Sequence, residues 1–138
     1  MRAATQTTSI DAPADAVFAF VADPANLPRW AVEFAKEVKE VTANDAKDGL
    51  WLVTTADGQG QVSLRPVTDK TLGVVDWHVI LPGGVESVVY SRVVPRGAGS
   101  EFVFTQVQVP AIPDELFDRL VKSAEHELMT LKALMEAE

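Results

Sequence analysis

The sequence predicts an α+β protein in which a curved, antiparallel, seven-stranded sheet wraps around a long C-terminal helix, with two short helices after the first strand. Three observations lead to this fold class. Six β-branched, partly alternating segments fill the middle of the chain, one apolar stripe at helical spacing runs through its end, and two proline-marked segments follow the first strand. The 138 residues suit one domain spanning residues 1–138, long enough to bury a core.

The first elements are short. Residues 3–10 predict a strand with one polar face. Residues 12–23 should form a short helix, because Pro13 suits the first helical position. An Asp-Pro pair then predicts a new helix start, so residues 23–34 should hold a second helical piece that is broken near Pro28.

The pattern changes from helical to alternating at about residue 35. The apolar runs that follow are separated by Gly, Pro, Asn and Asp, which is the chemistry of hairpin turns. The predicted strands span residues 34–43, 49–55, 60–68, 70–81, 85–94 and 101–109. Because short connections join antiparallel neighbours, these strands should form a meander.

The chain ends in a predicted helix from about Pro113 to Glu138. At about 1.5 Å per residue it would run roughly 40 Å, enough to cross a whole sheet. The apolar stripe that should face the sheet consists of Phe117, Leu120, Val121, Ala124, Leu128, Leu131 and Met135. His126 lies opposite this stripe and should be exposed.

Composition excludes several classes of function. The chain has 12 basic and 20 acidic residues, and a net charge of −8 argues against nucleic acid or anionic membranes as partners. No apolar run is long enough for membrane insertion, and the segment MRAATQTTSI lacks a signal-peptide core, so we expect a cytoplasmic protein. The chain has no cysteine, which excludes disulfides and thiolate ligands. With few histidines as well, we expect no metal site and no cofactor.

Two motifs carry a resemblance to a known family. They are the I-x-A-P-A-x-x-V-F segment at Ile10–Phe18 and the D-P-x-N-L-P-x-W segment at Asp23–Trp30. With the meander and the terminal helix, they resemble the START-like or Bet v 1-like (SRPBCC) superfamily, and more narrowly its polyketide cyclase/dehydrase and lipid-transport members. The resemblance covers essentially the whole chain and implies the helix-grip fold. It says less about chemistry, because the superfamily holds binders, carriers, cyclases and partner modules.

An Asp-x-His pair, Asp76 and His78, raises the question of which strand face looks inward. Side chains alternate along a strand, so this pair lies on one face and Trp77 on the other. A two-residue turn at residues 69–70 would place the pair beside a polar set on the preceding strand: Gln61, Ser63 and Arg65. The pair should therefore lie on the outer face and Trp77 should face the helix. A bulge at Gly73 would reverse this assignment.

The next strand depends on the loop before it. A four-residue loop at residues 81–84 would place Glu86, Tyr90 and Arg92 on the inner face, whereas a slip of one residue would turn them outward. In the last strand, Phe102, Phe104, Gln106 and Gln108 should point inward, because two outward phenylalanines would be costly to solvate.

The resemblance implies a gap between the sheet and the helix, and together with the face assignments it predicts a ligand site in an internal, mostly apolar cavity. Aromatic side chains would make apolar contact, while a tyrosine and an arginine would orient a polar group of the ligand. The predicted ligand-binding residues are Trp30, Phe34, Trp51, Leu64, Val75, Trp77, Glu86, Tyr90, Arg92, Phe104 and Gln106. The catalytic residues, if any, are not determined by the sequence.

Three classes of function remain open. The first is binding or carrying a small hydrophobic or aromatic molecule in the cavity. The second is polyketide cyclase/dehydratase-like chemistry, with Glu86, Tyr90 or Arg92 moving a proton, or Asp76 and His78 if the faces are reversed. The third is a protein-partner module with a closed cavity and an exposed apolar patch. The ligand is not determined, and a monomer and a homodimer are both compatible with the sequence.

Overall fold

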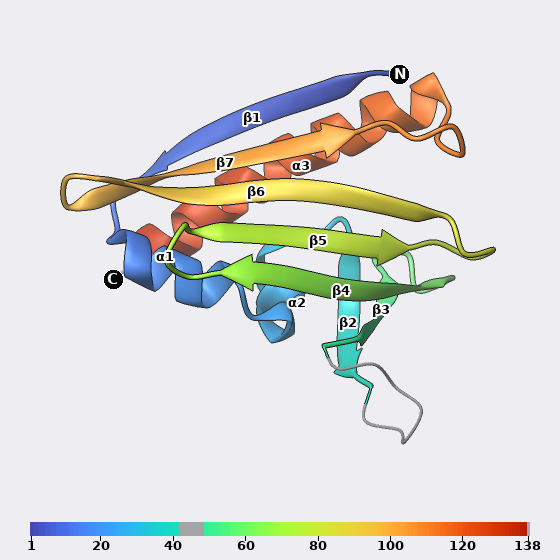
Figure 1. Cartoon of the computed structure of the whole chain (residues 1–138), viewed down its shortest axis with the longest axis horizontal. Coiled ribbons are helices and arrows are strands. Elements are labelled where there is room, and N and C mark those ends of the chain that lie inside the picture. The colour runs from blue at the N-terminus through green and yellow to red at the C-terminus, as the bar shows by residue number, and fades with distance from the viewer. Residues whose placement is uncertain (42–48, 138) are drawn as a thin grey trace.

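The computed structural model of the chain describes residues 1–41 and 49–137. In these residues one antiparallel sheet of seven strands has the order β1-β7-β6-β5-β4-β3-β2, and the long helix α3 packs along it (Figure 1). The short helices follow β1, with α1 at the end of the molecule opposite the N-terminus and α2 nearer its middle (Figure 1). The predicted α+β helix-grip fold is confirmed.

The strands and helices have the following bounds. The strands are β1 (Ala3–Ile10), β2 (Ala35–Glu40), β3 (Trp51–Thr55), β4 (Gln61–Asp69), β5 (Val74–Ile80), β6 (Glu86–Arg96) and β7 (Gly99–Val107). The helical elements are α1 (Ala14–Val21), the 3-10 turn η1 (Pro24–Asn26), α2 (Leu27–Trp30) and α3 (Asp114–Glu136). The predicted strand end at residues 42–43 and helix end at residue 138 lie outside the described residues.

The helical segment after β1 is shorter than expected. Asp23 caps η1 as predicted, since its Oδ1 accepts a hydrogen bond from the backbone N–H of Ala25 at 3.0 Å. Pro28 lies in the first turn of α2, where its missing N–H breaks no hydrogen bond, so it begins this helix instead of breaking one. Helix α2 ends at Trp30, and the chain turns into β2.

The turn between β4 and β5 is longer than predicted, yet the strand faces are as predicted. Asp69 pairs with Val74, so four residues form the turn in place of two. This moves the pairing by an even number of residues, which leaves each side chain on its expected face. Gly73 ends the turn with φ +71, and a Cβ there would lie 2.2 Å from the carbonyl oxygen of Val93 on β6. Gly73 therefore permits a close approach of two backbones and does not bulge the strand.

The loop between β5 and β6 corrects one expectation. Ile80 pairs with Glu86, so the loop has five residues where four were expected. Gly83 and Gly84 both adopt positive φ, and the Leu81 backbone N–H closes the loop on the carbonyl of Val85 at 2.8 Å. The slip of one residue exchanges the faces of β6. The predicted inward orientation of Glu86, Tyr90 and Arg92 is wrong, and the residues that point inward are Ser87, Val89, Ser91 and Val93.

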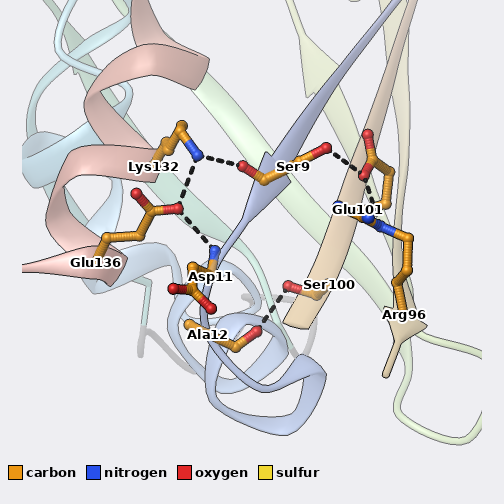
Figure 2. Close-up of polar contacts among 8 residues, drawn as sticks. All are labelled: Ser9, Asp11, Ala12, Arg96, Ser100, Glu101, Lys132 and Glu136. Atoms are coloured by element: carbon orange, nitrogen blue, oxygen red, sulfur yellow. Dashed lines mark hydrogen bonds and ion pairs between the residues drawn. The ribbon is translucent and has the colours of Figure 1, made fainter. Parts of the chain in front are cut away.

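The C-terminal end of α3 is fixed to the end of β1 by polar contacts (Figure 2). The ammonium group of Lys132 donates to the carbonyl oxygen of Ser9 at 2.6 Å and pairs with Glu136 at 2.7 Å. Glu136 in turn accepts a hydrogen bond from the backbone N–H of Asp11 at 2.7 Å. Hydrogen bonding to Lys132 and to the backbone holds the pKa of Glu136 below its usual value. These contacts fix where α3 crosses the sheet, and with it the space between the two layers.

Candidate functional site

A cavity of about 450 Å³ lies between the inner face of the sheet and α3. Strands β5, β6 and β7 form one wall, α3 forms the facing wall, and α2 with the segment that follows it closes one end. The lining side chains from the sheet are Thr55 at the end of β3 and, from the other strands, Trp77, Val79, Ser87, Val89, Phe104 and Gln106. The volume is within the range of about 300–1,000 Å³ that is typical of small-molecule sites.

Four aromatic rings form a connected group beside the cavity. Trp30 and Trp77 have ring centroids 5.8 Å apart, and Trp77 and Phe104 are 5.9 Å apart. Phe102 closes the group, with its ring 6.0 Å from those of Trp30 and Phe104. These separations are favourable for tilted and edge-to-face packing, so the rings hold one another in place and present a preformed apolar surface.

Helix α3 contributes a buried carboxyl group to the opposite wall. Glu127 is only 7% exposed and lines the cavity together with Leu116, Leu120 and Ser123. Burial raises the pKa of Glu127 to about 7, and the nearby charge of Glu33 acts in the same direction. At neutral pH this side chain can therefore both accept and release a proton inside the cavity.

Glu127 connects α3 to the chain segment after α2. Its Oε2 accepts a hydrogen bond from the backbone N–H of Glu33 at 3.1 Å. The carboxylate of Glu33 returns to α3, where it contacts Nδ1 of His126 at 2.5 Å and accepts a hydrogen bond from Ser123 Oγ at 3.1 Å. The prediction that His126 is exposed is confirmed. This network places Glu33 at the cavity wall and keeps Glu127 oriented.

Three buried polar atoms on cavity-lining residues have no hydrogen-bond partner in the described part of the chain. They are Trp30 Nε1, Trp77 Nε1 and Gln106 Oε1. Trp30 and Trp77 are 1% and 5% exposed. The amide nitrogen of Gln106 is used, since it donates to the carbonyl of Leu120 at 3.1 Å. Unpaired buried groups are costly, and because the three atoms have almost no accessible surface, a bound molecule would reach them only after the surrounding side chains move.

The structure brings about half of the predicted site residues together. Those that line the cavity are Trp30, Phe34, Trp77, Phe104 and Gln106. Leu64 and Val75 point inward but are fully buried in the core, and they do not line the cavity. Trp51 shares the inner face with Leu64, its partner across β3 and β4, and lines a different hollow near Pro28 and Val38.

The three polar residues expected from β6 lie on the outer face of the sheet. Tyr90 is 47% exposed, and the guanidinium of Arg92 donates to the carbonyl of Leu72 at 3.0 Å. Glu86 contacts the ring of His78, and this hydrogen bond lowers the pKa of Glu86. None of the three borders the cavity.

Asp76 and His78 also lie on the outer face, as predicted. Asp76 accepts a hydrogen bond from the backbone N–H of Ser91 at 3.3 Å, and His78 pairs with Glu86. Trp77, between them, points into the core and is part of the cavity wall. Among the described residues, no group of three His, Cys, Asp or Glu side chains is arranged to hold a metal ion.

The sequence reasoning missed Glu127. The sequence did contain a signal for its burial. Leu120 and Ala124 lie seven and three residues before Glu127, and Leu131 lies four residues after it. At 100° per residue these positions share one side of the helix. A charged residue within such a stripe is a candidate for a buried functional group.

Residues 1–136 match the sequence model of the family described as polyketide cyclase / dehydrase and lipid transport. The chain belongs to this family. A comparison with curated proteins finds no match. In the described part of this family member, no helix has both the length and the apolar character needed to cross a membrane.

Several solved structures share the fold of this polyketide cyclase / dehydrase and lipid transport family member. The di-domain ARO/CYC BexL from the BE-7585A biosynthetic pathway is 21% identical with a TM-score of 0.74, and the match covers 96% of this chain and 45% of BexL. The chain thus spans about half the length of that protein. A START superfamily protein from Mycobacterium smegmatis is 18% identical with a TM-score of 0.70, covering 98% of this chain and 97% of that one. A Bacillus thuringiensis protein is 13% identical with a TM-score of 0.78, covering 97% and 98%.

Proposed function

We propose that the protein binds or carries a small hydrophobic or aromatic molecule in the cavity between the sheet and α3. The observation that carries the proposal is the cavity of about 450 Å³ beside a preformed group of aromatic rings. Trp30, Phe34, Trp77 and Phe104 would supply most of the apolar contact. The cavity also favours this function over a partner-binding module, for which we expected a closed interior.

The unpaired polar atoms add a requirement for the ligand. The indole N–H groups of Trp30 and Trp77 are donors, and the amide oxygen of Gln106 is an acceptor. A ligand with a hydroxyl or carbonyl group offers them partners, whereas a pure hydrocarbon offers none. An apolar body with one or two polar substituents therefore fits the site best.

Intrinsic tryptophan fluorescence tests this proposal. Two tryptophans line the cavity and Trp51 does not, so a Trp51→Phe variant reports on the cavity alone. Titration with a library of lipids, polyketides and aromatic compounds should give a saturable change in emission in this variant. If no compound class changes the emission, and a crystal structure shows a filled interior, the proposal is wrong.

Polyketide cyclase/dehydratase-like chemistry is a second candidate, and Glu127 is the specific observation that favours it. Such chemistry needs a group that removes a proton beside a carbonyl while the cavity holds the reacting chain in a folded pose. Glu127 lines the cavity and has a pKa of about 7, which suits a general base at neutral pH. BexL is described as an ARO/CYC protein, and the shared fold is compatible with this role.

Proton abstraction can be measured without the natural substrate. Benzylacetone in deuterated buffer exchanges the protons next to its carbonyl slowly, and NMR follows the incorporation of deuterium. The protein should accelerate this exchange, and Glu127→Gln should remove the acceleration while binding is retained. Equal exchange with and without the protein would argue against the enzyme candidate and leave the binding proposal intact.

A further inference from the structure

The charged groups that line the cavity all have the same sign. Among the described lining residues, the ionisable side chains are the carboxyls of Glu33, Asp57 and Glu127. Asp57 lies in the turn between β3 and β4, where hydrogen bonds from the Gln59 backbone and the Thr55 hydroxyl hold its pKa below the usual value. The three carboxyl groups come from three parts of the cavity lining: the segment after α2, the β3–β4 turn and α3.

We propose that the cavity prefers ligands that carry an ammonium group on an apolar body, with Glu127 as the counter-ion, and that it disfavours apolar carboxylates. This inference rests on the proposed binding function and specifies the class of ligand. A cavity for fatty acids or other organic acids would be expected to place a cation beside the ligand's head group, and no cationic side chain is among the described lining residues.

The position of Glu127 provides the attraction. It is 7% exposed and lies on the wall opposite the sheet, where water screens a charge poorly. An ammonium group beside it would stabilise the ionised carboxylate, which is otherwise disfavoured by burial. The backbone N–H of Glu33 donates to Oε2, and the backbone N–H of Phe34 also interacts with the carboxylate, which has about four lone pairs and so keeps capacity for a ligand.

The aromatic rings add to the same preference. The faces of tryptophan attract cations more strongly than those of other aromatic residues, and the attraction grows when the pair is removed from water. Trp30 and Trp77 provide such rings in a buried setting. A ligand carboxylate would gain nothing from these faces and would lose its water beside one or more carboxyl groups.

The preference should depend on pH, because Glu127 must lose a proton to pair with an ammonium group. The other charged groups that face it are Glu33, from the segment after α2, and His126, its neighbour on α3. Asp57 lines the same cavity from the β3–β4 turn. Affinity for an amine should therefore rise between about pH 5 and pH 8, where Glu127 ionises. Affinity for a neutral alcohol of the same shape should stay nearly constant.

Isothermal titration calorimetry with three probes of matched apolar shape tests the inference: phenylbutylamine, phenylbutanol and phenylbutyrate. At pH 8 the amine should bind roughly tenfold or more tightly than the carboxylate, with the alcohol between them. Glu127→Gln should reduce the ratio of amine to alcohol affinity by about tenfold and change the alcohol affinity less than about threefold. The matched control is Glu125→Gln, an exposed change on the same helix that should leave all three affinities as they are.

The outcomes separate this inference from the function on which it rests. If none of the probes binds while the library titration of the Trp51→Phe variant gives a saturable response, the inference is wrong and the binding function stands; if neither assay gives a response, both fail. If the carboxylate binds as tightly as the amine, the inference is wrong and the binding function stands. The wild-type protein gives a check that needs no variant, because an amine-to-alcohol ratio that does not rise from pH 5 to pH 8 would also overturn the role of Glu127.

Discussion

Replacing Glu127 by glutamine should stabilise the protein at neutral and alkaline pH and have almost no effect below about pH 4. Burial raises the pKa of this carboxyl group from 4.5 to about 7. A tenfold change in proton affinity corresponds to about 1.4 kcal/mol, so a charged Glu127 costs the folded state about 3 kcal/mol. Glutamine has nearly the same shape, carries no charge, and can still accept the hydrogen bond from the Glu33 backbone.

The sign of the pH dependence follows from which state holds the proton. At about pH 4.5 and below, Glu127 is protonated in the folded state and largely protonated in the unfolded state, so the two states differ little. Between about pH 4.5 and pH 7, the unfolded state has released a proton that the folded state still holds, so the free energy of unfolding falls as pH rises. The variant lacks this loss, and its advantage should grow to about 3 kcal/mol by about pH 8.

Urea unfolding followed by circular dichroism at several pH values between 4.5 and 8 measures this difference. The control is Glu125→Gln, which removes an exposed carboxyl from the same helix and should change stability by less than about 0.5 kcal/mol at every pH. A Glu127→Gln protein that is no more stable than wild type at pH 8 would refute the reasoning. So would an advantage that stays constant with pH, since it could not come from ionisation.

Three further outcomes are expected. Gly73→Ala should destabilise the protein by about 2–4 kcal/mol in urea unfolding, because its Cβ would collide with a carbonyl of β6. Gly83 also has a positive φ but has open space around it, so Gly83→Ala should cost about 1 kcal/mol. Similar costs for the two variants would argue against the close approach at Gly73. Val89→Phe should fill the cavity and weaken binding of an aromatic probe at least about tenfold, whereas Val88→Phe on the opposite face should not. Arg92→Ala should leave the affinity for the same probe within about twofold, because its side chain lies on the outer face. A large loss of affinity would indicate that Arg92 points into the cavity.

The strand faces around Trp77 could be predicted even though the turn before β5 was not. The polar set on β4 and the Asp76–His78 pair share one face, and any even shift of register preserves that relation. The prediction therefore survived a turn of four residues in place of two. The period of two along a strand is a local property of the backbone, and the sequence displays it directly.

The face of β6 could not be predicted in this way. Valine pairs occupy positions 88–89 and 93–94, so both registers place valines on the inner face and the hydrophobic pattern does not distinguish them. The register depends on the length of the Leu81–Val85 loop, in which two glycines permit several turn geometries. As a result, the expected polar contacts from Glu86, Tyr90 and Arg92 are replaced by Ser87 and Val89 at the cavity.

The order of the elements, the seven strands and the long terminal helix could be predicted from the sequence, because they depend on periodicity and on turn residues close together in the chain. Which polar groups meet in the cavity depends on the tertiary structure. Glu127 is buried because a segment about ninety residues earlier in the chain, at Glu33 and Phe34, packs against it, and its pKa follows from that burial. The helical period places Glu127 beside the apolar stripe, but it does not show which distant segment packs against it, so the acidic, aromatic character of the site appears only when the layers are assembled.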